Sequence, residues 1–74
     1  MTRRKQLKID IELLEEEMKL LEAKRNRSQA QIIECLISKQ DPPADEVQFF
    51  RTFSAEIEVK RERLVELIKE LKSL

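Results

Sequence analysis

The chain of 74 residues contains no glycine, no histidine, no tryptophan and no tyrosine, and it has only two prolines and one cysteine. Without glycine there is no phosphate-cradling loop, because such loops need backbone conformations that glycine adopts most readily. Without histidine there is no imidazole to act as a base or metal ligand, and a single thiol is too little for a zinc site. We therefore expect a non-enzymatic protein with no catalytic residue, no metal and no cofactor.

The charge of the chain is balanced, with 15 Lys or Arg residues, 15 Asp or Glu residues and a formal net charge of zero. This balance argues against a general affinity for nucleic acid or for an acidic membrane surface. No stretch approaches the roughly 20 apolar residues of a membrane span. The basic start of the chain is not followed by the apolar run of a secretory signal. We expect a cytoplasmic protein whose partner is neither nucleic acid, membrane nor a small-molecule substrate.

What the sequence does contain is a 3-4 spacing of mostly apolar residues in each half, which we call the seam. This spacing is the heptad signature of helices that wind around each other. In the first half the seam consists of Leu7, Ile11, Leu14, Met18, Leu21, Arg25, Ser28, Ile32 and Cys35. In the second half it consists of Phe50, Phe53, Ile57, Lys60, Leu64, Leu67, Leu71 and Leu74.

The only break in this pattern lies at Pro42 and Pro43. Proline disfavours helix at the preceding residue but is tolerated in a first helical turn. We therefore predict one all-α domain over residues 1–74, with helices at about 4–39 and 45–73 and a corner at 40–44. So short a connection makes the helices antiparallel. The start of the first helix stays open between Thr2 and Asp10, because Arg3, Arg4 and Lys5 lie where the helix dipole is positive, whereas Asp10 is a good cap. We expect fraying before Asp10.

The seam also predicts a register between the two helices. If facing residues have numbers that sum to about 85, every seam residue finds a seam partner. Arg25 then lies opposite Lys60, and we expect both charged ends to leave the seam for acids such as Glu22 and Glu56. The alternative is that this polar layer faces an acidic group on a partner.

Apolar residues outside the seam predict where the protein binds a partner. A two-helix fold cannot cover both faces of its helices with its own side chains. The off-seam apolar residues concentrate near the corner, together with all three aromatic residues of the chain. The alternative is that they only broaden the core at the hairpin tip. The predicted partner-binding set is Phe49, Phe50, Phe53, Val47, Ile33, Leu36, Ile37, Leu13, Leu20 and Ile68.

The segment after the corner, Asp45-Glu46-Val47-Gln48-Phe49-Phe50 leading to Ile57-Glu58, resembles the small hairpin chaperones of bacterial type III secretion needle subunits. The likeness covers about residues 31–64. It implies a hairpin that pairs with a larger helical-repeat chaperone and keeps the needle subunit monomeric before export. In this chain the heptads are more regular and the corner has two prolines, so a self-associating coiled-coil homodimer without a client stays an alternative.

A second likeness involves residues 53–58. The run Phe53-Ser54-Ala55-Glu56-Ile57-Glu58 is similar to the Ser-Gln-Glu-Leu-Asp core of small two-helix phosphatases that act on response regulators. Ala55 and Glu58 stand where that core has a glutamine and an aspartate. The phosphatase is therefore the remote alternative. The sequence favours a protein-binding module that covers an apolar surface of another helical protein, as a secretion chaperone or co-chaperone.

Overall fold

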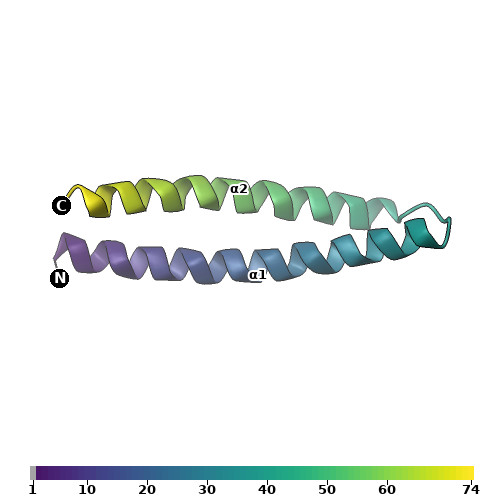
Figure 1. Cartoon of the computed structure of the whole chain (residues 1–74), viewed down its shortest axis with the longest axis horizontal. Helices are drawn as coiled ribbons and strands as arrows, with labels where there is room; N and C mark the ends of the chain where they lie inside the picture. Colours follow the sequence, from purple (N-terminus) through teal and green to yellow (C-terminus); the bar gives the residue numbers. More distant parts are fainter. Residues whose placement is uncertain (1) are drawn as a thin grey trace.

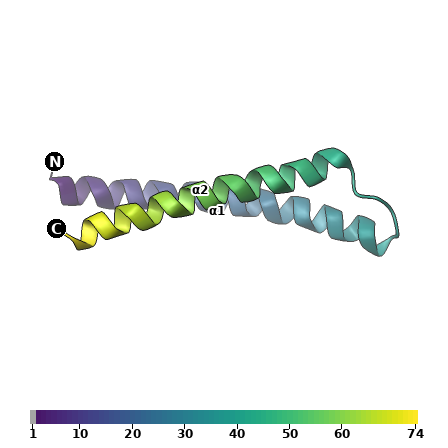
Figure 2. The same ribbon diagram turned by 90° about the horizontal axis from the view of Figure 1, so that it is seen from above.

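A computed structural model describes residues 2–74 and contains two helices, α1 (Arg3–Ile37) and α2 (Ala44–Lys72). They run antiparallel and lie side by side along a rod of 55 × 16 × 15 Å, as Figures 1 and 2 show. The described residues contain no strand. The predicted all-α antiparallel hairpin is thus confirmed.

The first helix begins at the earlier of the two starts that the sequence allows. Thr2 has extended backbone angles and caps α1, and its Oγ1 accepts a hydrogen bond of 3.3 Å from the backbone N–H of Lys5. A threonine side chain in this role satisfies one of the amide groups that have no partner inside the helix. This cap extends the helix to Arg3, so Asp10 lies within it rather than at its start, and the structure does not show the expected fraying before Asp10.

The turn between the helices begins two residues before the predicted corner. The backbone N–H of Gln40 donates a hydrogen bond of 2.8 Å to the carbonyl oxygen of Cys35. The backbone N–H of Lys39 donates one of 3.1 Å to the carbonyl oxygen of Leu36. This pair of bonds is the Schellman motif that ends many helices. It places Lys39 in the left-handed region, with φ of 58°. Ala44 then starts α2 directly after the extended Pro43, one residue before the predicted start at about 45.

The seam forms the contact between the helices. Its best buried apolar residues are Leu7, Leu21, Ile57 and Leu67, and Ser28 is buried with them. Every other seam residue is half-buried except Leu74, whose exposed fraction is 62%. Leu74 lies beyond the last residue of α2, so the prediction that it packs in the seam is wrong.

The register differs from the predicted one by about one heptad. Lys60 forms an ion pair of 2.7 Å with Glu17, and Arg3 forms one of 2.6 Å with Glu70. The residue numbers in these pairs sum to 77 and 73, so the predicted sum of about 85 is wrong. Lys60 therefore faces a segment eight residues, or about 12 Å, before Arg25.

The shape of the turn explains this shift. A displacement of seven residues leaves seam residues facing seam residues, so apolar packing alone does not choose between the two registers. In the structure α1 extends farther toward the turn than α2 does (Figures 1 and 2). The connection returns from the end of α1 to the start of α2. The shift also separates Arg25 from Lys60, which the predicted register would have placed in one layer. The expected contact of Lys60 with Glu56 is replaced by its contact with Glu17.

Candidate partner-binding surface

Within the described residues there is no candidate metal site. No group of three or more Cys, Asp or Glu side chains in residues 2–74 is placed to hold a metal ion. Cys35 is a free thiol that is half-buried in the seam. In the same residues, neither helix has a stretch that is long and apolar enough to cross a bilayer. Exposed apolar side chains are the features that remain to be explained.

The most exposed of these side chains, Ile37, lies at the end of α1 together with other exposed apolar residues. Leu36 and Ile37 have exposed fractions of 60% and 76%, and Ile33 one turn earlier is also exposed. The register is the cause, because the last turn of α1 extends past the start of α2 and has no helix beside it (Figures 1 and 2). We call Ile33, Leu36 and Ile37 the turn-end surface.

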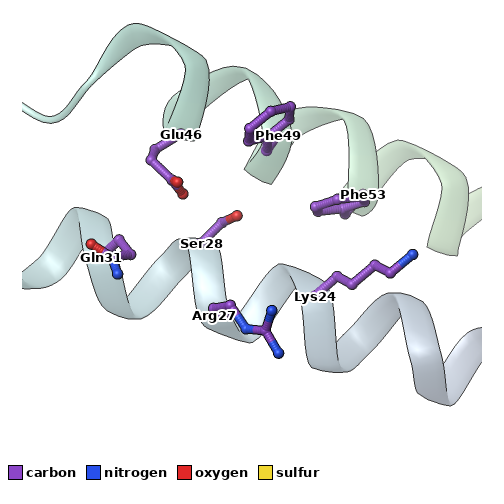
Figure 3. Close-up of a pocket in the computed structure, with 7 residues that line it drawn as sticks. All are labelled: Lys24, Arg27, Ser28, Gln31, Glu46, Phe49 and Phe53. Atoms are coloured by element: carbon purple, nitrogen blue, oxygen red, sulfur yellow. The ribbon is translucent and has the colours of Figure 1, made fainter.

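A shallow hollow of about 320 Å³ opens between the helices near the turn, on another side of the molecule. Phe49 and Phe53 form its wall on α2, and their rings stack with centroids 6.2 Å apart. Figure 3 shows both rings above the α1 segment from which Lys24 and Ser28 project. Phe49 is exposed, whereas Phe53 is half-buried, which agrees with their positions off and on the seam. The hollow is lined by Lys24, Arg27, Ser28, Gln31, Glu46, Phe49 and Phe53.

The structure divides the predicted cluster at the corner between two faces. Gln31 lines the hollow, and Ile33 lies about 200° further around α1, since each residue turns the helix by about 100°. The same spacing separates Val47 from Phe49 on α2. Ile33 and the half-buried Val47 therefore face away from the aromatic hollow. Phe50 is half-buried in the seam between the two faces.

The predicted residues along the shaft also differ in accessibility. Leu13 and Leu20 are exposed, whereas Ile68 is half-buried. Sequence reasoning left Val59 out of the binding set, yet its side chain is 67% exposed. Its position off the seam, in the middle of α2, is the signal that would have identified it.

Charged side chains surround these apolar residues and pair mostly along the surface. Besides the two pairs between helices, Glu16 pairs with Lys19, Glu58 with Arg61 and Glu66 with Arg63. Exposed pairs of this kind contribute at most about 1 kcal/mol each. Glu58, at the aspartate position of the phosphatase likeness, is thus bound to a neighbouring arginine on its own helix.

Fold and surface together define a two-helix hairpin whose exposed apolar residues indicate a surface for binding another protein or a second copy. Comparisons with protein-family models, with curated proteins and with solved structures find no match to this chain. Of the resemblance to needle-subunit chaperones, the structure supports the two-helix hairpin fold alone.

Proposed function

We propose that this protein is a non-enzymatic binding module that covers an apolar surface of another helical protein, as a secretion chaperone or co-chaperone does. The observation that carries the proposal is the turn-end surface, where Leu36 and Ile37 are largely exposed on a helix end that has no neighbour. Clustered exposed apolar side chains commonly mark protein-binding sites. The cytoplasmic location expected from the sequence stays a prediction.

The shape of the molecule favours a helical partner. The overhanging end of α1 presents apolar residues at a spacing of three and four, namely Ile33, Leu36 and Ile37. This is the spacing at which a helix packs against another helix. A partner helix laid along α1 would replace the contacts that α2 does not make there.

Affinity capture with matched variants tests this function. The variant Leu36→Gln/Ile37→Gln removes the two exposed side chains while glutamine preserves helix propensity. The control Ile9→Gln/Val65→Gln removes two exposed apolar residues near the chain ends instead. We expect the parent and the control, but not the turn-end variant, to retain one helical protein, with circular dichroism showing equal helicity. A partner retained equally by the turn-end variant would contradict the placement of the site.

The chaperone role has its own test, since binding alone does not show it. The captured partner is produced with and without the hairpin, and its size distribution is measured by light scattering. We expect it to polymerise or aggregate alone and to stay monomeric in the complex. A partner that remains monomeric by itself would contradict a chaperone function. The variant Phe49→Ala belongs in the same panel, because a loss of binding there would move the site to the aromatic hollow.

A further inference from the structure

The middle of the hairpin carries a second set of exposed apolar residues, Leu13 and Leu20 on α1 and Val59 on α2, which we call the shaft face. The exposed fractions of Leu20 and Val59 are 65% and 67%. Leu20 follows Leu13 by seven residues, so both lie on the same side of α1. None of the three belongs to the turn-end surface.

The two helices present these residues on one side of the molecule. Leu13 lines a hollow between the helices together with Glu17 and Arg63. Val59 lies beside Glu56 on α2. Glu56 precedes Arg63 by seven residues, so Glu56 and Arg63 lie along the same edge of α2. The shaft face is therefore continuous across α1 and α2.

The ion pair between Glu17 and Lys60 shows which residues lie at the same height along the rod. Val59 is adjacent to Lys60, and Leu20 follows Glu17 by three residues. With a rise of about 1.5 Å per residue, Leu20 and Val59 are within about one turn of each other in height. The central apolar residues of the two helices thus form one level of the shaft face.

Two charged residues next to this level have no ion-pair partner within residues 2–74. Lys24 on α1 and Glu56 on α2 are both exposed, and neither takes part in any of the ion pairs of the described chain. By the same reasoning on height, Lys24 and Glu56 lie within about one turn of each other. Next to this level the shaft face of the described chain therefore carries Lys24 as a free cation on α1 and Glu56 as a free anion on α2.

We propose that a second copy of this chain docks on the shaft face, related by a twofold axis parallel to the helices, to form an antiparallel four-helix bundle. A half-turn about this axis places α1 over α2 of the partner without any shift along the rod. Each level then meets the same level of the other copy. Leu20 packs against the partner's Val59, and Lys24 faces the partner's Glu56 twice in the dimer.

The charges favour this arrangement over one in which the second copy lies on the same face but points in the opposite direction along the rod. A twofold axis perpendicular to the helices and centred near Leu20 would place α2 over α2 of the partner. Glu56 lies at that height, so it would face its own copy, and like charges in direct opposition destabilise a contact. The parallel axis brings the same carboxylate to a lysine instead.

The size of the face suits a stable dimer. The side of the rod that carries the shaft face measures 55 × 16 Å, or roughly 900 Å² in outline, so a standard interface of about 800 Å² per partner would cover most of that side. The shaft face and the turn-end surface have no residue in common. The dimer does not rest on the proposed function, so either proposal can fail without the other.

Sedimentation of charge variants at low salt tests the proposal, since salt screens exposed pairs. Lys24→Glu alone puts two acids at each contact, and Glu56→Lys alone puts two bases there. We expect each variant alone to dimerise about tenfold more weakly than the parent. An equal mixture of the two variants restores both contacts as opposite charges, so we expect it to form heterodimers as tight as the parent dimer.

Two more variants keep the test decisive. Leu20→Glu should abolish the dimer, whereas Leu36→Glu on the turn-end surface should leave it intact, with helicity measured for both. A parent chain that stays monomeric at high micromolar concentration would overturn the proposal. So would a mixture that is no tighter than the separate charge variants, a Leu20→Glu chain that dimerises like the parent, or a dimer that only Leu36→Glu disrupts.

Discussion

At the scale of single residues, the position with the clearest conformational cost is Lys39. It ends α1 with a positive φ of 58°, a region in which the Cβ atom of an ordinary residue is crowded. Glycine is the usual residue at this point of a Schellman motif, and the chain contains none. The two backbone bonds of the motif hold Lys39 in this conformation.

We expect Lys39→Gly to stabilise the hairpin by about 1 kcal/mol, because it removes the Cβ atom from a left-handed position. Lys39→Ala is the matched control, since it removes the same charge and keeps the Cβ atom. Chemical denaturation of both variants measures the difference. Equal stability of the glycine and alanine variants would show that the backbone at residue 39 is not left-handed in solution.

Two aromatic residues on α2, Phe49 and Phe53, differ in how far they are buried. Phe49 and Phe53 are four residues apart and stack on each other, yet one is exposed and the other is half-buried. The heptad position explains the difference, because Phe53 points to α1 and Phe49 lies beside the seam. The contact with Phe53 also means that Phe49 contributes to stability, by about 1 kcal/mol for such a ring pair.

At the scale of the helices, the register decides which residues meet. The seam pattern repeats every seven residues, so sliding α2 by one heptad preserves its apolar contacts. The polar seam residue Lys60 breaks this equivalence, because it faces Glu17 in one register and Arg25 in the other. A single polar residue in a heptad seam is a known means of selecting register.

Chemical cross-linking distinguishes the two registers. In a Cys35→Ser background, we expect a short bismaleimide to link the cysteines of Glu17→Cys/Lys60→Cys within one chain. The pair Arg25→Cys/Lys60→Cys should not link, since the two positions are offset by about 12 Å along the rod. Mass spectrometry of the monomer fraction identifies the product. The opposite result would restore the register in which numbers sum to about 85.

At the scale of the whole molecule, the hairpin has few buried apolar residues for its length. Within residues 2–74, four apolar side chains are buried, while ten large ones are exposed. A domain below about 80 residues rarely obtains more than about 3–5 kcal/mol from a single core. Burial of the shaft face in a dimer would add apolar contacts that the isolated hairpin lacks.

Stability should therefore depend on protein concentration. For a dimer that unfolds to separate chains, a tenfold increase in concentration adds about 1.4 kcal/mol to the free energy of unfolding per dimer. We expect the thermal midpoint of the parent to rise with concentration and that of Leu20→Glu to stay constant. Circular dichroism in cells of different path length measures both. A parent midpoint that does not change with concentration would contradict the dimer.

Much of this architecture is determined by the sequence alone, because it depends on local spacing. The 3-4 pattern identifies the seam residues, and the proline pair locates the turn and the start of α2. The absence of other breaks predicts two long helices. The exposure of Leu13 and Leu20 follows from their positions off the seam.

Only the tertiary structure decided how the two helices are placed along each other. A heptad repeat makes registers one heptad apart nearly equal in apolar packing, so the choice depends on the geometry of the turn and on ion pairs between distant residues. The observed register has the Schellman motif at Lys39 in its turn and the ion pair between Glu17 and Lys60 between its helices. From it follow the overhang that exposes Ile37 and the similar height of Leu20 and Val59, because these depend on the relative placement of the helices, which local spacing does not encode.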